Sequence, residues 1–379
     1  MPATFPFSGS YACTSEVAFL MRRLQMAPTS LAERERLIQS GQSHYSEMIG
    51  PEDAPTRERV RLFRESLAAN AQRMAEDLSK LAAALVASAV DGELTIVSIA
   101  RAGTPIGVLL WHRVREIAPH LRLSHYSISV IRDRGVDYAA LLWIMERHHP
   151  GSLRFVDGWT GKGTIAVELQ RSIASWKAAP PALDAGLWVP LDVCGAARFA
   201  ASTEDYLIPS TLLGGTISGL VSRSVLPADQ EGQMHGCVPL LHLRRYDLSR
   251  WFVSEMRTRM ATLPLQTAEI VGVEQPTEEE RSARREVTRL FLDGMLERHN
   301  MSDRNRVKLG IGETVRVLLR RMPQVVWLNS TANATDAALI RRLAALRNTP
   351  VQTEADLAFD AVAVIATVAS QPSSSNFLT

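Results

Sequence analysis

The 379-residue sequence has few cysteines, few lysines, few aromatic residues and no long apolar run. Its three cysteines, Cys13, Cys194 and Cys237, lie far apart and form no CxxC pair, which argues against a structural zinc site and a disulfide framework. The uncharged apolar run at 81–90 is far shorter than the roughly 20 residues of a membrane-spanning helix. The N-terminus has no basic stretch followed by an apolar one, so we expect a cytoplasmic protein without membrane contact.

The chain also has almost no net charge. Its 42 basic and 40 acidic residues leave +2, which argues against a polyelectrolyte partner for the whole chain. Only four of the basic residues are lysines, and one of these, Lys162, lies in a glycine-rich turn. The hydrophobic fraction of 46% and the length predict a globular protein of about two or three domains.

Apolar periodicity divides the chain. Residues 1–90 show the three- and four-residue spacing of amphipathic helices, at 17–24 and again at 62–85, which predicts a helical N-terminal layer packed on a core. In 91–265, β-branched segments alternate with helical ones, which predicts an α/β domain with a parallel sheet covered by helices on both faces. The predicted strands are 95–100, 125–131, 153–157 and 187–193, and the predicted helices begin near Ile106, Tyr138 and Ile165.

The remaining residues predict a second, smaller α/β domain. Residues 266–280 have the composition of a solvated linker, 281–370 alternate between helical and strand patterns, and 371–379 suggest a flexible tail. Arginine and lysine outnumber acids by 14 to 6 over 281–350, but only by 14 to 13 over 270–379. Such an excess is as typical of a solvated helix face as of a nucleic-acid surface.

The segment 156–164, ValAspGlyTrpThrGlyLysGlyThr, joins a predicted buried strand to a helix. Glycines let backbone N–H groups approach an anion, and the N-terminus of the following helix adds partial positive charge. We therefore predict a phosphate site made of Thr160, Gly161, Lys162, Gly163 and Thr164. The spacings of Walker A and of GxGxxG are not met, and glycines that merely turn the chain are the alternative.

This strand, acid and Thr/Gly-rich loop resembles the phosphoribosyl-pyrophosphate signature of type I phosphoribosyltransferases, whose fold is a parallel α/β sheet. The resemblance places Asp157 on the second acid of the signature, where it would hold ribose hydroxyls or a substrate-borne Mg2+, while Val156 replaces the first acid. The turn Arg101, Ala102, Gly103 and Thr104 is similar to the family's pyrophosphate loop. Arg132 and Arg134 lie where the family carries a mobile lid, with a solvated loop as the alternative.

Longer phrases, such as GlyGlnSerHisTyrSerGluMet and PheValAspGlyTrpThrGlyLysGly, are similar to a bacterial subfamily associated with tellurite- and stress-resistance gene clusters. In that subfamily a phosphoribosyltransferase-like domain precedes a Pelota-type RNA-binding domain, whose start resembles 309–321. The resemblance implies transfer of a phosphoribosyl group from its Mg2+–pyrophosphate donor to a base or other nucleophile, with RNA as a partner of the second domain. The implied catalytic residues are Asp157, Arg101, Arg132 and Arg134, and the acceptor side is predicted at Asp192, Asp205 and Tyr206.

The same subfamily is also described under a cysteine-protease name, StiP. A cysteine protease needs a thiolate with a histidine nearby, and Cys194 and Cys237 are the candidates, the latter two residues after His235. This alternative requires a histidine nitrogen within hydrogen-bond reach of one of these thiols. A second alternative is a non-catalytic protein that binds a ligand and RNA.

Overall fold

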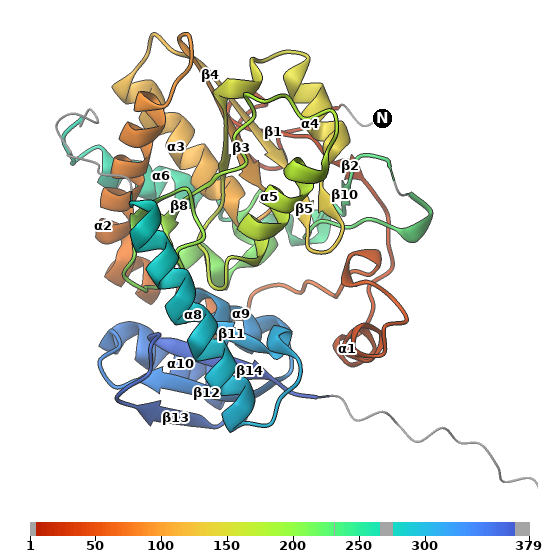
Figure 1. The fold of residues 1–379 in the computed structure, drawn as a ribbon, viewed down its shortest axis with the longest axis vertical. Helices are drawn as coiled ribbons and strands as arrows, with labels where there is room; N and C mark the ends of the chain where they lie inside the picture. Colours follow the sequence, from red (N-terminus) through yellow and green to blue (C-terminus); the bar gives the residue numbers. More distant parts are fainter. Residues whose placement is uncertain (1–4, 231, 266–275, 368–379) are drawn as a thin grey trace, which may run out of the picture.

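The computed structural model describes residues 5–230, 232–265 and 276–367, and it places a large N-terminal part against a smaller C-terminal domain (Figure 1). The core of the large part is a six-stranded sheet in which every neighbouring pair is parallel. The strand order is β1 (Ala18–Phe19), β4 (Arg122–Ile128), β3 (Glu93–Ile99), β7 (Leu153–Val156), β8 (Leu187–Leu191), β9 (Phe199–Ser202). The predicted parallel α/β sheet is therefore confirmed.

Helices cover both faces of this sheet, and its central strands β3 and β7 are accordingly buried at every position rather than at alternate ones. One face packs on α2 (Arg57–Ala87), α3 (Gly103–Ile117) and α6 (Ser249–Met260). The other face packs on α4 (Tyr138–Met145) and α5 (Thr164–Ser175). No helix in the described parts of the chain is long and apolar enough to cross a membrane.

Smaller elements connect these layers. They are α1 (Leu31–Gln39), the pair β2 (Arg22–Arg23) and β10 (Gly236–Cys237), and the hairpin β5 (Val130–Ile131) and β6 (Gly135–Val136). Short 3-10 helices span Tyr45–Glu47, Pro150–Ser152, Pro209–Leu212, Gly214–Ile217, Ala228–Gln230, Leu241–Tyr246 and Arg304–Arg306.

The predicted helix over 17–24 is wrong, because this segment forms β1 and β2. The five residues from Val17 to Met21 are all buried, so their burial is consecutive and not confined to one face of a helix. Consecutive burial suits a short strand that is enclosed on both sides. Here β1 pairs with β4 at the edge of the sheet, and the Phe19 N–H donates to the Phe7 carbonyl oxygen at 2.8 Å.

The C-terminal domain is a four-stranded mixed sheet with helices on both faces. Its strand order is β11 (Val307–Leu309), β14 (Ala361–Ile365), β12 (Pro323–Asn329), β13 (Val351–Glu354). Helices α9 (Ile311–Arg320) and α10 (Ala334–Ala345) share a core with the large part, while α8 (Glu278–Arg298) covers the opposite face. The predicted small α/β domain is therefore confirmed.

The segment predicted as a linker ends in helix rather than in solvated chain. Glu278, Glu279 and Glu280 form the first turn of α8, where acids favour the helix dipole. The Thr277 side chain accepts from the Glu280 N–H and the Glu280 carboxylate accepts from the Thr277 N–H, which is a capping box. Linker residues 266–275 and the predicted tail 371–379 lie outside the described residues.

Polar contacts join the C-terminal domain to α1, to α2 and to the chain at Leu207. The buried Asp336 carboxylate accepts from Asn70 Nδ2 at 3.0 Å and from the Leu207 N–H at 3.1 Å. Arg321 pairs with the buried Glu35. This docking brings α9 to the carboxyl ends of β3 and β7, the edge at which parallel α/β sheets bind ligands.

Candidate functional site

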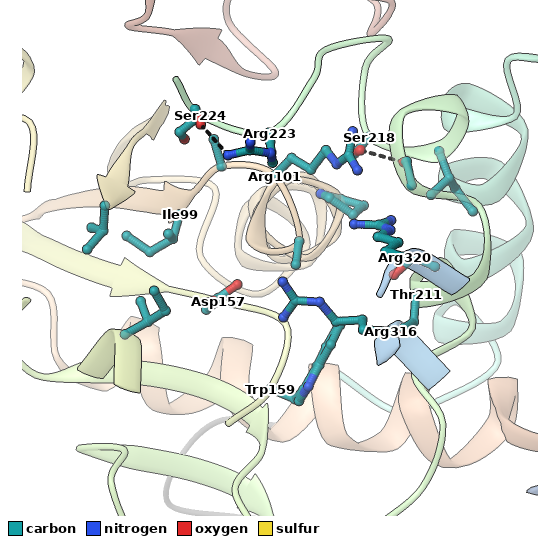
Figure 2. Close-up of a pocket in the computed structure, with 18 of the residues that line it drawn as sticks. Ile99, Arg101, Asp157, Trp159, Thr211, Ser218, Arg223, Ser224, Arg316 and Arg320 are labelled. Atoms are coloured by element: carbon teal, nitrogen blue, oxygen red, sulfur yellow. Dashed lines mark hydrogen bonds between the residues drawn. The ribbon is translucent and has the colours of Figure 1, made fainter. Parts of the chain in front are cut away.

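A cleft of about 180 Å³ lies between α9 and the carboxyl ends of β3 and β7 (Figure 2). The turn after β3 contributes Arg101 and Ala102, and the turn after β7 contributes Asp157 and Trp159. The remaining walls come from the Tyr45 region, the β5 strand, the chain between 210 and 224, and α9. Segments of both the large part and the C-terminal domain therefore build the cleft.

Four arginines dominate its charge: Arg101, Arg223, Arg316 and Arg320. Arg101 pairs with Glu52 at 2.6 Å, and Arg316 pairs with Glu313 at the same distance. Arg223 donates to neutral carbonyl oxygens, including that of Tyr45 at 2.6 Å. Burial, and then repulsion by Arg101, hold the pKa of Arg320 well below its usual range. The cleft thus concentrates more positive charge than its acids offset.

Asp157 is the acid in the cleft lining. Its side chain is almost buried, and its Oδ1 accepts from the Gly158 N–H at 2.7 Å. Burial raises the pKa of Asp157 to about 7, although Arg316 opposes the shift. In Figure 2 the Arg316 guanidinium lies over Trp159 and on the Asp157 side of the cleft. Asp157 therefore exchanges a proton near neutral pH.

The predicted pyrophosphate loop divides between the cleft and the core. Arg101 and Ala102 line the cleft, as expected for a turn at this edge. Gly103 begins α3, where a Cβ would lie 2.6 Å from the Val156 carbonyl oxygen, so the position requires glycine. The Thr104 hydroxyl is buried against the Ser127 hydroxyl at 2.7 Å and does not line the cleft.

The C-terminal domain covers the predicted phosphate loop. Lys162 Nζ donates to the Arg304 carbonyl oxygen at 2.6 Å, and Gly161 faces Leu309 so closely that a Cβ would lie 2.8 Å from the Leu309 carbonyl oxygen. The Thr160 hydroxyl donates to Asp192, and Gly163 takes a positive φ of 72° before α5. Thr164 is exposed at the start of α5, and none of the five residues lines the cleft.

Neighbouring groups hold the predicted lid residues. Arg132 and Arg134 lie in the turn between β5 and β6. The Arg132 N–H donates to the Tyr45 hydroxyl at 2.8 Å, and its guanidinium donates to Asn305 Oδ1 at 3.3 Å. Arg134 pairs with Glu47 at 2.5 Å. The hairpin therefore contacts both the Tyr45 region and the C-terminal domain.

The three residues predicted on the acceptor side make structural hydrogen bonds and do not line the cleft. The Asp192 carboxylate accepts from backbone N–H groups, including that of Cys194 at 2.9 Å. Asp205 accepts from the Ile311 N–H at 2.9 Å at the start of α9, and burial raises the pKa of Asp205 to about 8. The Tyr206 hydroxyl donates to Asp77 on α2 at 2.8 Å.

The two thiols predicted as alternative nucleophiles are buried. Burial, with the Asp192 charge adding to it, raises the pKa of Cys194 far above its usual range, and burial raises that of Cys237 to about 12. Cys194 Sγ contacts Thr160 and Asp192, while His235 Nδ1 bonds the Ser129 hydroxyl at 2.8 Å. Among the described residues, no hydrogen bond joins a histidine to either thiol. These surroundings oppose the thiolate that a nucleophile needs.

The third thiol has the opposite surroundings. Cys13 is exposed, and its Sγ lies 2.9 Å from the Ser15 hydroxyl. This hydrogen bond, followed by one from the Glu16 N–H, lowers the pKa of Cys13. The Glu16 carboxylate accepts from the Ala12 N–H at 2.9 Å and bonds His112 Nε2 at 2.7 Å. An activated thiol and an acid–imidazole pair therefore share Glu16.

Sequence reasoning missed most of the residues that form the arginine cleft and the surroundings of Cys13. Arg316 and Arg320 carried one usable signal, because they are four residues apart on a helix that is otherwise largely apolar. Arg223 and Tyr45 carried none, since they reach the cleft through long-range packing. Cys13 was noticed only as an isolated cysteine, and no pattern linked it to His112.

Within the described parts of the chain, no cluster of donors suits a resident metal. The described residues contain no group of three or more His, Cys, Asp or Glu side chains placed to hold an ion. Asp157 could offer a single carboxylate beside Arg316, which repels cations. Mg2+ arriving with a substrate at Asp157 stays a prediction.

Comparison with known proteins names the chain's relatives. Residues 9–257 match the family model described as "Tellurite-like stress resistance cysteine protease StiP", and residues 286–367 match the PELOTA RNA binding domain. A protein of Acinetobacter baylyi named "Cysteine protease StiP" is 39% identical over 366 residues, covering 92% of this chain and 91% of that protein. No solved structure matches, so the phosphoribosyltransferase-like fold assignment stays a prediction.

These comparisons correct the predicted activity. Phosphoribosyl transfer is wrong as the main function, because the family model and the curated relative are both named as cysteine proteases. The names agree instead with the alternative that the sequence left open, although neither identifies the nucleophile. The matches cover most of the chain, which therefore belongs to the StiP family of tellurite-like stress resistance proteins and carries a PELOTA domain at its C-terminal end.

Proposed function

We propose that this chain is a cysteine-dependent peptidase and that Cys13 is its nucleophile. Membership of a family named for a cysteine protease supports the activity. The observation that supports the residue is the lowered pKa of the exposed Cys13 thiol, in contrast to the raised values at the buried Cys194 and Cys237. The thiolate is the reactive form of cysteine, so exposure and a low pKa favour Cys13.

Glu16 links the segment that carries Cys13 to an imidazole, the second group that peptide hydrolysis requires. Among the described residues no hydrogen bond joins His112 to Cys13 Sγ, so the mechanism requires the two groups to approach each other when substrate binds. The Ser15 hydroxyl and the Glu16 N–H stabilise the thiolate, and the Glu16 carboxylate orients His112. In this mechanism the thiolate attacks the peptide carbonyl, and the amine leaves with a proton from the His112 imidazolium. These steps leave the acyl part of the peptide bound to Cys13 as a thioester. The neutral imidazole then takes a proton from water, whose oxygen attacks the thioester carbon, and the carboxylic acid and the thiolate are released.

A peptide library incubated with the full-length protein tests the proposal, with cleavage measured by mass spectrometry. We expect Cys13→Ser to abolish cleavage and His112→Gln to lower the rate by about 10²–10⁴-fold. Cys194→Ala and Cys237→Ala are matched controls that should retain it. Cleavage by Cys13→Ser would overturn the assigned nucleophile. Wild-type cleavage no greater than that of the triple cysteine variant would overturn the peptidase itself.

We also propose that the C-terminal domain binds RNA, which the match of 286–367 to the PELOTA RNA binding domain supports. Part of the arginine excess over 281–350 is not available to bind RNA. Arg320 faces the cleft, and Arg321 pairs with Glu35. The exposed basic groups of α8, such as Arg284 and Arg289, are better placed to contact phosphates, although Arg289 pairs with Glu286 and Asp293 on the same helix.

Filter binding of the full chain to a single-stranded RNA at several salt concentrations tests this second function. We expect affinity to fall with salt, and the double variant Arg284→Gln, Arg289→Gln to bind more weakly with a smaller salt slope. Arg115→Gln, an exposed arginine on α3 of the large part, is the control and should bind as wild type does. RNA affinity that does not change with salt would contradict phosphate recognition.

A further inference from the structure

The arginine cleft is separate from the proposed peptidase site. The first turn of α3 faces the cleft, whereas His112 lies nine residues further along the same helix, about 14 Å away at 1.5 Å per residue. The cleft therefore needs an explanation of its own. We infer that it binds a small organic phosphate, and that the site is complete only when the C-terminal domain contributes Arg316 and Arg320.

The first support is an imbalance of charge. Four guanidinium groups line the cleft against one carboxyl group, that of Asp157. From outside the lining, Glu52 pairs with Arg101 and also attracts Arg320, and Glu313 pairs with Arg316. Arg223 bonds only carbonyl oxygens in the described structure, and the guanidinium of Arg320 makes no hydrogen bond or ion pair with a described residue. An anion would supply the missing charge, and planar guanidinium groups match phosphate oxygens well.

The second support is a set of buried polar groups without partners. Thr211 and Ser224 both line the cleft and are only 5% and 7% exposed. The hydroxyl oxygens of both side chains lack a hydrogen-bond partner among the described residues. Buried polar groups are nearly always satisfied, so a ligand with acceptor oxygens explains these two better than the empty protein does. Figure 2 shows Thr211 beside Arg320 and Ser224 beside Arg223.

The form of the cleft decides the class of ligand. Its volume of about 180 Å³ is below the range typical of drug-sized ligands, which excludes a folded RNA or a long peptide segment. Ile99, Ile165 and the ring of Trp159 form apolar walls next to the arginines. The N-terminus of α3, whose Ala102 cap offers no side-chain acceptor, adds partial positive charge at the same place. These features fit a phosphate group attached to a small organic body.

The inference concerns binding alone and assigns no transfer step to the cleft. It requires both domains: Arg316 and Arg320 are one helical turn apart on α9, while Arg101 and Arg223 come from the large part. Removal of either α9 arginine should therefore weaken binding, although the predicted loop 160–164 would be intact.

Calorimetric titration of inorganic pyrophosphate into the full-length protein is the test. We expect saturable binding, with Kd raised at least about tenfold in Arg316→Gln and in Arg320→Gln. The control is Arg341→Gln, an exposed arginine on α10 of the same domain, which should bind as wild type does. Thermal unfolding adds a second readout: Arg320→Gln should keep or raise the Tm of the unliganded protein, because a repelling charge is gone, yet lose the Tm increase caused by pyrophosphate.

Four outcomes would overturn the inference. They are no saturable heat with folded wild type, equal affinity in Arg320→Gln and wild type, binding of citrate as tight as that of pyrophosphate, and RNA binding that the two α9 substitutions weaken as strongly as pyrophosphate binding. The last would assign the cleft to an RNA phosphate. Cys13→Ser should bind pyrophosphate normally, so failure of the peptidase proposal and failure of this one are separable.

Discussion

Two turns lie side by side at the same edge of the parallel sheet, but they differ in whether a ligand can reach them. The turn 101–104 after β3 opens into the cleft, whereas the turn 160–164 after β7 lies under the C-terminal domain. Residues 158–164, which include the second turn, have more of the local features of an anion site: three glycines, two threonines and a lysine. Local sequence therefore identified a plausible loop, but the docked domain decides which turn a ligand can reach.

An internal carboxylate lies where an external anion was expected. Glu313 packs on Gly161 and interacts with Lys162, Lys308 and Arg316. Burial opposes its ionisation, but Arg316 and then Lys308 lower the pKa of Glu313 overall. The covered turn thus has a protein anion beside it, while the open turn faces four arginines whose combined charge is only partly offset by acids. The following experiments test this contrast, from the largest expected effect to the smallest.

Loss of the docking contact should affect both turns together. Asp336→Ala leaves the Asn70 amide and the Leu207 N–H without their buried acceptor, so we expect a loss of about 3 kcal/mol in the free energy of unfolding. Urea denaturation measures the loss, and hydrogen exchange should show faster exchange at 160–164. Asp356→Ala, at an exposed position of the same domain, should change neither. Unchanged exchange at 160–164 in a destabilised variant would mean that docking does not cover the turn.

Enlarging the covered turn should cost more than enlarging its neighbour. A Cβ at Gly161 would lie 2.8 Å from the Leu309 carbonyl oxygen, whereas a Cβ at Gly158 would meet nothing closer than 3.4 Å. We expect Gly161→Ala to lower the free energy of unfolding by about 2 kcal/mol through overpacking, and Gly158→Ala to lower it by less than about 1 kcal/mol. Thermal and urea unfolding compare the pair. Equal effects would show that the C-terminal domain does not press on this turn.

The two turns should also respond to pH in opposite directions. Burial raises the pKa of Asp157 to about 7 from 3.8, so the folded protein binds the extra proton and its stability falls as pH rises through this range. Burial, and then Lys308, lower the pKa of Lys162 to about 7 from 10.5, so the unfolded chain binds more protons and stability rises with pH above 7.

Urea titrations at pH 4, 8 and 10 separate these effects. Relative to wild type, Asp157→Asn should gain stability at pH 8 and gain little at pH 4, because at pH 4 the folded-state acid is protonated and the unfolded-state acid, with its pKa of 3.8, is only partly ionised. Between pH 8 and pH 10, the free energy of unfolding of wild type should instead rise relative to that of Lys162→Met. Parallel pH profiles for both variants and wild type would show that neither group titrates as its burial implies.

The sequence predicted regular structure best where one physical pattern dominated. The alternation of β-branched and helical segments located β3, α3, β4, β7, α5 and β8 within a few residues. It failed at 17–24, where burial on both sides imitates helical spacing, and it missed β9, β11 and β13, which are short. It also assigned Glu278–Glu280 to a linker, although Thr277 and Glu280 form a recognisable helix start.

The predicted site residues also differ in whether the structure brings them to the cleft. Arg101 and Asp157 were placed at one edge of the sheet because parallel strands end together there, and the structure brings both to the cleft. Asp192, Asp205 and Tyr206 were predicted on the acceptor side and instead hold the fold together. Among the cysteines, the choice depended on burial, which spacing does not encode.

The sequence by itself determined the parallel sheet, the smaller second domain and the place where strand ends gather polar side chains, because each depends on patterns within about ten neighbouring residues. Only the tertiary structure decided that α9 covers one turn and adds Arg316 and Arg320 beside the other. It also decided that Cys13 is open to solvent while Cys194 and Cys237 are buried. Access and charge balance depend on contacts between segments far apart in the chain, and such contacts exist only after the two domains have packed.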